Sequence, residues 1–162
     1  METIIVRRAE TRDLDDILRL NLALFEKEYQ EYDSSLDIEW VYDETRGKKY
    51  FQKRVNAEGF AAVSEYEGRV VGYLCGGIHE SENFRKKIRT ACLENMLVEE
   101  YVRGKGLGKK LFNVFLDWCK ENKIELISVT ASAQNKQGIG FYRANGFQDY
   151  NLTLELKLKG ND

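Results

Sequence analysis

The residues of this sequence with the clearest chemical signature form a glycine-rich loop, Val102-Arg103-Gly104-Lys105-Gly106-Leu107-Gly108-Lys109-Lys110. The apolar run Met96-Leu97-Val98 before it predicts a strand, and the periodic apolar residues after it predict a helix. Glycines between a strand and a helix let the backbone turn tightly and bring its N–H groups close to a ligand. The free N–H groups and the positive end of the helix dipole then favour phosphate. The loop is therefore predicted to cradle a pyrophosphate.

Two common phosphate-binding patterns do not fit this loop. The Walker pattern ends in Gly-Lys-Ser/Thr and begins with a glycine, but here Lys110 follows Gly108-Lys109 and Arg103 occupies the first position. The dinucleotide fingerprint needs a third glycine where Lys109 or Leu111 stands. The motif supports neither a nucleoside triphosphate nor NAD as ligand.

The pattern that fits is Arg-x-x-Gly-x-Gly, from Arg103 to Gly108. It resembles the acetyl-CoA signature of the GCN5-related N-acetyltransferase (GNAT) family. A second stretch, Asn135 to Phe147, is similar to the family's Asn, spacer, Tyr and closing Gly-Phe, and Glu94 to Val98 resembles its central strand. The resemblance is specific from Tyr66 to Phe147 and generic before it.

The resemblance implies an α/β (α+β) fold with a central mixed, mostly antiparallel twisted sheet flanked by about four helices. It implies one GNAT domain over residues 1–162 and an enzyme, an acyltransferase that moves acetyl from acetyl-CoA to a primary amine by direct attack in a ternary complex. The implied partners are acetyl-CoA and the amine acceptor, with a homodimer as a further possibility.

Acetyl transfer needs a base, because an alkyl amine is mostly protonated at pH 7. A carboxylate with a raised pKa can take that proton directly or through water. Glu94 lies on the strand that leads into the cradle, where the family often carries its glutamate, and is the first candidate; a salt-bridged strand residue is the alternative. Asp117 and Glu99 are weaker candidates.

The departing thiolate needs an acid, and Tyr142 follows Asn135 by the spacing at which the family's tyrosine faces the CoA sulfur. A phenol with a pKa of about 10 can share a proton with a thiol of about 8.5. The alternative for Tyr142 is an aromatic core residue. Asn135 is expected to bind the pantetheine amides, or instead to cap a helix.

The cofactor contacts implied by the resemblance are mostly contacts of the backbone. The thioester carbonyl is expected at the N–H groups of Met96, Leu97 or Val98, with Leu97 or Val98 favoured, which would form the oxyanion site. The phosphates are expected at Arg103 and at the backbone of the cradle, Gly104, Lys105, Gly106, Leu107, Gly108 and Lys109, with Lys110 as a further positive charge.

The acceptor is indicated only by composition. The segment from Glu26 to Asp43 is acidic and aromatic, which suits a small cationic amine by charge and by cation–π attraction. A protein or peptide amine is an alternative, and so is a regulatory module that binds CoA without turnover. A nucleic-acid domain would rest on one short basic cluster around Lys86 and lacks interleaved aromatic residues.

Composition narrows the class of protein further. The 162 residues carry a net charge of −2, which argues against nucleic-acid binding by bulk charge. No apolar run is long enough to cross a bilayer and no signal peptide is visible, so the expected location is the cytoplasm, without a membrane partner. Cys75, Cys92 and Cys119 lack metal-ligand spacing and are expected as buried free thiols. The single histidine, His79, argues against a metal site and is expected in a loop or at a strand end.

Patterning along the chain predicts one α/β domain without linkers or repeats. The strands are expected at residues 4–8, 60–66, 69–74, 92–98, 124–130 and 152–158, with a Glu67-Gly68 turn in a hairpin. The helices are expected from Asp13, at 44–56, at 107–122 and at 136–144, and a polar loop at 81–89.

Overall fold

A computed structural model describes residues 1–56 and 58–160 of the chain. The chain divides into two compact units, Met1–Thr130 and Ala131–Asp162. The expectation of a single domain over all 162 residues stays a prediction.

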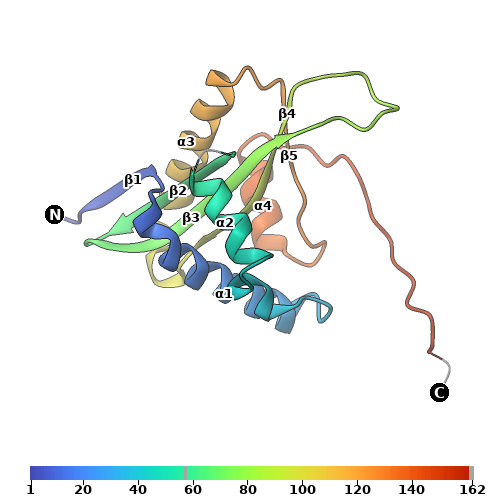
Figure 1. Cartoon of the computed structure of the whole chain (residues 1–162), viewed down its shortest axis with the longest axis horizontal. Helices are drawn as coiled ribbons and strands as arrows, with labels where there is room; N and C mark the ends of the chain where they lie inside the picture. Colours follow the sequence, from blue (N-terminus) through green and yellow to red (C-terminus); the bar gives the residue numbers. More distant parts are fainter. Residues whose placement is uncertain (57, 161–162) are drawn as a thin grey trace. The chain divides into compact units, whose positions relative to one another are not determined.

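The first unit is built on one five-stranded sheet with the strand order β1-β2-β3-β4-β5 (Figure 1). Neighbouring strands are antiparallel except β4 and β5, which are parallel, so the expected mixed, mostly antiparallel sheet is confirmed. The strands are β1 (Ile4–Arg8), β2 (Phe60–Tyr66), β3 (Arg69–His79), β4 (Thr90–Val98) and β5 (Leu126–Val129).

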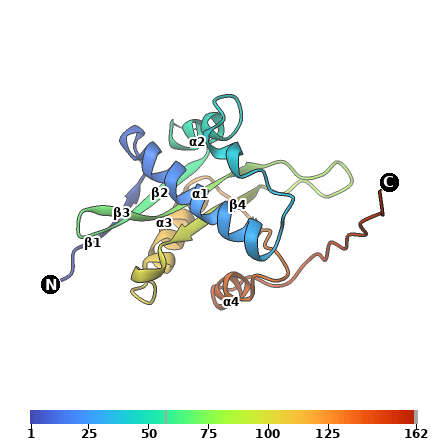
Figure 2. The ribbon, with the colours of Figure 1, turned by 90° about the horizontal axis from the view of Figure 1, so that it is seen from below.

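Three helices of this unit cover the two faces of the sheet (Figure 2). They are α1 (Leu14–Glu31), α2 (Gly47–Asn56) and α3 (Leu107–Glu121). Residues of α1 and α2, such as Ile17 and Phe51, form a buried cluster with Tyr73 of β3. Leu107 of α3 packs with Val71 and Val102 in a second cluster. The sheet is therefore a layer between two apolar cores, which agrees with the almost continuous burial of β2 and β3.

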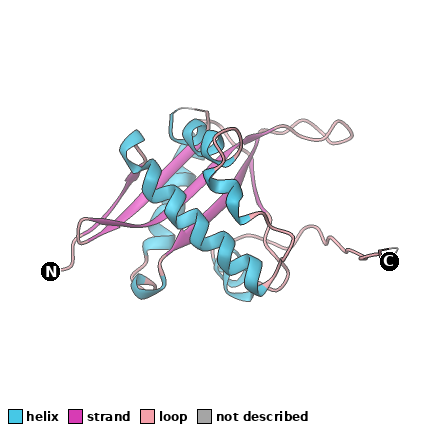
Figure 3. Cartoon of the chain, turned by 60° about the horizontal axis from the view of Figure 1, so that its bottom comes forward, coloured by secondary structure: helices cyan, strands magenta, loops and turns pink. Residues whose placement is uncertain are grey.

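The hairpin between β2 and β3 turns at the predicted pair of residues. Glu67 has φ 51° and Gly68 has φ 79°. Two positive φ values in a two-residue link are the signature of a turn that matches the twist of the flanking strands. The next connection, residues 80–89, is a loop that projects beyond the sheet (Figure 3).

The second unit contains α4 (Lys136–Ala144), with the predicted bounds. Gly146 has φ 94° just past its end, as a glycine at a helix C-terminus commonly does. Four helices were expected and four are present in the described chain, beside three short 3₁₀ turns.

Several predicted bounds were wrong: the strand expected at 69–74 extends to His79, and the strand expected at 124–130 covers only Leu126–Val129. The second helix begins at Gly47 and not at Glu44, and a Cβ on Gly47 would lie 2.2 Å from the Trp40 carbonyl oxygen. The strand expected at 152–158 does not form, and residues 147–160 adopt neither helix nor strand. Alternating leucines favour a strand only when a neighbouring strand is present to pair with them. Among the described residues, no helix is both long and apolar enough to span a membrane.

Candidate active site

The predicted cradle is the loop between β4 and α3. Gly104 and Gly106 adopt φ values of 82° and 78°, and Gly106 is the N-cap residue of α3, without a side-chain cap. The first intrahelical bond runs from the Lys110 N–H to the Gly106 carbonyl. The N–H groups of Leu107, Gly108 and Lys109 therefore have no partner within the helix and present the positive end of a 15-residue helix. This arrangement can bind a phosphate.

Two basic side chains of the cradle bind groups of the protein itself. Arg103 Nε donates to the Val98 carbonyl at 3.0 Å and ties the loop to the end of β4. Lys105 Nζ donates to Glu2 at 2.7 Å and lies over the Tyr66 ring. Lys109 Nζ lies 5.6 Å from the Phe112 ring centre, and Lys110 is exposed. The groups of the cradle that are best placed to bind an anion are therefore its backbone N–H groups and not its lysine side chains.

The edge of β4 opens immediately before the cradle. β5 pairs with β4 only from Thr90 to Leu93, and within the described residues no other strand pairs with residues 94–98 on that side. The Glu99 N–H donates to the Val71 carbonyl of β3 at 2.8 Å. Because N–H groups alternate in direction along a strand, those of Val98 and Met96 face the open edge and that of Leu97 faces β3. Of the predicted oxyanion donors, the geometry favours Val98 and Met96 over Leu97.

A β-bulge lies where β4 and β5 part. Cys75 is paired with Asn95 and Gly76 with Leu93, which leaves Glu94 as an extra residue. Two consecutive side chains, Glu94 and Asn95, consequently reach the same group, the Tyr50 hydroxyl, at 2.9 and 3.0 Å. Bulges of this kind redirect side chains near active sites.

Glu94 is held by three side chains from two elements. Arg54 of α2 donates from Nε and Nη2 to the two carboxylate oxygens at 2.6 and 3.0 Å, and Tyr50 donates to Oε1. His79, the last residue of β3, has Nε2 3.1 Å from Oε2. The side chain of Glu94 is only 15 % exposed.

These contacts shift the pKa of Glu94 in the direction opposite to the one predicted. Burial raises the pKa of Glu94, but the hydrogen bonds from Arg54 and His79 and the charge of Arg54 outweigh it, so its pKa lies below the ordinary value. The expected raised pKa is therefore wrong. The assignment of Glu94 as the base stays a prediction, for a carboxylate that is a weaker base than expected.

The weaker candidates for the base lie elsewhere. Glu99 accepts from Arg19 at 2.6 Å, and Asp117 is exposed on α3.

The three thiols are buried or half-buried. Cys75 and Cys119 are buried and Cys92 is half-buried, and all three are free. Burial raises the pKa of Cys119 to about 11 and raises that of Cys75 further. A thiol needs a lowered pKa to be a reactive nucleophile, so these groups suit packing. The described residues contain no cluster of metal-ligating side chains.

The other two predicted site residues belong to the second unit. Asn135 is the N-cap of α4 and accepts from the Gly138 N–H at 3.0 Å, which is the capping alternative. Tyr142 packs edge-on against Phe141 and Phe147, each 5.6 Å away between ring centres. Their part in cofactor binding and as the acid remains a prediction.

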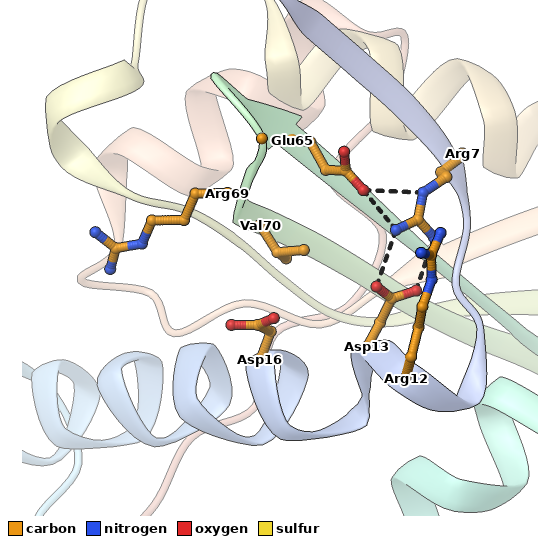
Figure 4. A pocket seen from close by; sticks show the side chains of 8 residues that line it. Arg7, Arg12, Asp13, Asp16, Glu65, Arg69 and Val70 are labelled. Carbon is orange, nitrogen blue, oxygen red and sulfur yellow. Dashed lines mark hydrogen bonds and ion pairs between the residues drawn. The ribbon is translucent and has the colours of Figure 1, made fainter.

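A surface pocket of about 340 Å³ lies at the start of α1 (Figure 4). There Arg7 donates to both oxygens of Asp13, at 2.7 and 2.9 Å, and to Glu65. Figure 4 shows Arg7 between these two acids, so the cluster joins β1 and β2 to Asp13, the residue just before α1. None of the predicted site residues lines this pocket.

The sequence interpretation missed the neighbours of Glu94. Tyr50 and Arg54 stand four positions apart on α2, which places both on one helix face. That spacing could have predicted that Tyr50 and Arg54 act together on one face of the helix. Nothing in the sequence linked them to Glu94 or to His79. His79 was expected in a loop or at a strand end, and it is the last residue of β3.

Comparison with known proteins points to one family. The model of the acetyltransferase (GNAT) family matches residues 14–147. The chain is 27 % identical over 152 residues to an uncharacterized N-acetyltransferase of Methanocaldococcus jannaschii, covering 92 % of this chain and 62 % of that protein. It is also 27 % identical over 150 residues to thialysine N-epsilon-acetyltransferase of Bos taurus, covering 92 % and 86 %. A spermine/spermidine N(1)-acetyltransferase of Bacillus subtilis is 30 % identical over 84 residues, covering 51 % of this chain and 55 % of that one.

Solved structures show the same fold. A mutant protein from Bacillus halodurans superposes with a TM-score of 0.82 at 21 % identity, covering 96 % of this chain and 99 % of that one. An aminoglycoside N-acetyltransferase in complex with CoA gives 0.73 at 14 % identity, covering 99 % and 97 %. With the cradle and the opened strand edge already described, the match of the family model across residues 14–147 shows that this chain belongs to the acetyltransferase (GNAT) family.

Proposed function

We propose that this protein transfers an acetyl group from acetyl-CoA to a primary amine by direct attack in a ternary complex. One observation carries the proposal: the uncapped start of α3 follows the unpaired edge of β4 after one short 3₁₀ turn and the glycine loop. A phosphate bound at the start of α3 and a thioester carbonyl bound at the edge of β4 would both contact backbone N–H groups of the same segment, residues 96–109. This is the arrangement that a long molecule with a pyrophosphate at one end and a thioester at the other requires.

Each part of this segment has a role in the proposed reaction. The N–H groups of Leu107 to Lys109 bind the pyrophosphate, and the N–H groups of Met96 and Val98 stabilise the oxyanion of the tetrahedral intermediate. Arg103 fixes the glycine loop to the end of β4 by its hydrogen bond to the Val98 carbonyl. Asn135 is proposed at the pantetheine arm and Tyr142 as the acid that protonates the departing sulfur, both from the family resemblance.

A small cationic amine is the proposed acceptor. Phe25 of α1 stacks on Trp40 with ring centres 5.5 Å apart, and Trp40 lies 5.7 Å from Tyr50, whose hydroxyl reaches Glu94. Aromatic faces that lead to a carboxylate attract an alkylammonium group. Asn95 Oδ1 is buried without a hydrogen-bond partner among the described residues, so it can accept from a bound amine. The named relatives include enzymes for thialysine, spermine and aminoglycosides, which are amines of this class.

The first test is release of CoA thiol from acetyl-CoA in the presence of polyamines, aminoglycosides, amino acids and short peptides. Turnover with one of the small amines is expected. Turnover with peptides alone would identify a protein or peptide acetyltransferase. Binding of acetyl-CoA without any turnover would favour a regulatory module and contradict the proposed enzyme.

The cradle is tested with a matched pair of glycine variants. Gly106 and Gly68 have nearly the same φ, 78° and 79°, and a Cβ at either would meet nothing within 4 Å. Gly106→Asp and Gly68→Asp therefore impose the same backbone strain, but only the first places a negative charge at the start of α3. We expect acetyl-CoA affinity, measured by calorimetry, to fall at least about tenfold in Gly106→Asp alone. Equal affinities in the two variants would contradict the cradle.

A further inference from the structure

The only histidine of the chain lies beside the carboxylate of the bulge. His79 Nε2 is 3.1 Å from Glu94 Oε2. The His79 side chain is 47 % exposed, whereas that of Glu94 is 15 % exposed. A ligand that reaches this cluster from solvent therefore meets the imidazole more readily than the carboxylate.

The charges around the pair fix which nitrogen of His79 carries a proton. Glu94 is held ionised by the bidentate contact with Arg54, and an ionised carboxylate only accepts hydrogen bonds. Nε2 must therefore be the N–H donor toward Oε2. In neutral imidazole the other nitrogen, Nδ1, then carries the free lone pair.

Within the proposed acetyl transfer, on which this assignment rests, we infer that His79 Nδ1 is the proton acceptor for the amine and that Glu94 is its positioning residue. The pairing of a neutral imidazole with an orienting carboxylate is the same device that other enzymes use to hold a histidine in its basic tautomer. Glu94 is suited to this second role because Arg54 and Tyr50 fix both of its oxygens.

The proton balance of the step is complete without another reagent. The alkylammonium gives one proton to Nδ1, and the resulting amine forms a C–N bond with the thioester carbonyl carbon. Collapse breaks the C–S bond, and a second proton from nitrogen ends on the CoA sulfur. One hydrogen stays on the amide nitrogen, and His79 returns its proton to water.

The pH dependence of this step reflects groups from three elements. His79 itself is on β3 with the buried thiol of Cys75, Glu94 is on β4, and Arg54 and Tyr50 face the pair from α2. Burial raises the pKa of Tyr50 and of Cys75, so neither ionises near neutral pH.

The test combines kinetics with the tautomer of the single histidine. Against an active amine at pH 7, we expect His79→Gln to lower kcat/KM by about 10²- to 10⁴-fold while acetyl-CoA affinity stays within about twofold. The loss should shrink as the pH approaches the pKa of the amine, about 10.4, because the substrate then arrives deprotonated. Glu80→Gln removes a neighbouring exposed carboxylate and is the control, with unchanged rates.

Nitrogen-15 NMR of the enzyme without any acceptor gives an independent result, since one histidine gives one set of ring signals. We expect the Nε2–H tautomer in the wild type and a loss of that preference in Glu94→Gln. An Nδ1–H tautomer, or His79→Gln with wild-type kcat/KM while Glu94→Gln is inactive, would overturn the assignment. A wild-type enzyme that acetylates no amine would instead contradict the proposed function. The observed tautomer would still show whether His79 Nε2 donates to Glu94.

Discussion

At the scale of single residues, Glu94 shows how neighbours set the chemistry of a side chain. Alone in an apolar site, a carboxylate would gain a raised pKa and become a stronger base. Here Arg54 supplies a bidentate partner and Tyr50 a further donor, so the ionised form is favoured. The pKa of Glu94 is lowered, and its carboxylate keeps a negative charge in a fixed position. Such a fixed charge is suited to orient His79.

The same contacts make stability depend on pH. The pKa of Glu94 in the folded protein lies below its ordinary value of 4.5, so folding favours the ionised form. This stabilisation is fully present above about pH 5.5 and is lost as the pH falls through the folded-state pKa.

Glu94→Gln should therefore lower the free energy of unfolding by roughly 1–3 kcal/mol at pH 7. We expect the difference from wild type to decrease as the pH falls below 4.5, measured by urea unfolding at several pH values. Glu80→Gln serves as the control. A difference that is constant with pH would mean that the ion pair with Arg54 does not contribute.

At the scale of elements, α4 depends on a glycine next to its cap. Asn135 Oδ1 accepts from the Gly138 N–H, and a Cβ on Gly138 would lie 2.5 Å from Asn135 Nδ2. Real Cβ atoms do not approach that closely, so alanine at 138 must displace the capping side chain. Gly140 in the same helix has open space around it.

The two glycines of α4 should consequently respond differently to alanine. Gly138→Ala is expected to give almost no net change, because loss of the cap costs about 1 kcal/mol and the gain in helix propensity is of the same size. Gly140→Ala is expected to strengthen the helix by about 1 kcal/mol, the difference in helix propensity. Amide hydrogen exchange of residues 138–144 measures both effects. Equal protection in the two variants would show that the cap is not the limiting contact.

At the scale of the whole molecule, the segment 152–158 exposes an apolar row. Leu152, Leu154, Leu156 and Leu158 are each more than three-quarters exposed, at 76, 83, 85 and 78 %. An extended backbone with unpaired N–H and C=O groups and an alternating apolar face can add to a sheet edge of another copy. We therefore expect a homodimer in which these leucines are covered.

The double variant Leu154→Lys with Leu156→Lys should shift the protein to monomer in sedimentation velocity. Thr153→Lys changes the other side of the same segment and should leave the dimer intact. A monomeric wild type at about 100 μM, where interfaces of ordinary affinity are formed, would contradict the expectation.

Local patterning was enough to predict most elements and the cradle. The bounds of β1 and α4 follow from periodicity over a few residues, and the turn at Glu67-Gly68 follows from a glycine that accepts positive φ. The cradle could be recognised because its glycines and the helix start that they expose are adjacent in the chain. Sequence adjacency was therefore enough to predict the fold class and to single out the loop that is proposed to bind phosphate.

The polar cluster at the bulge was decided only by tertiary structure. Glu94 meets His79 across 15 positions and Arg54 across 40, and the contact exists because β3 and β4 are paired and α2 packs on that face. One extra residue in β4 turns Glu94 and Asn95 to the same side, which no periodic pattern reveals. The direction of the pKa shift depends on these distances, because charge interactions fall with separation and strengthen with burial. The sequence specified which groups are present, and packing specified which side chains surround the carboxylate of Glu94 and hold it.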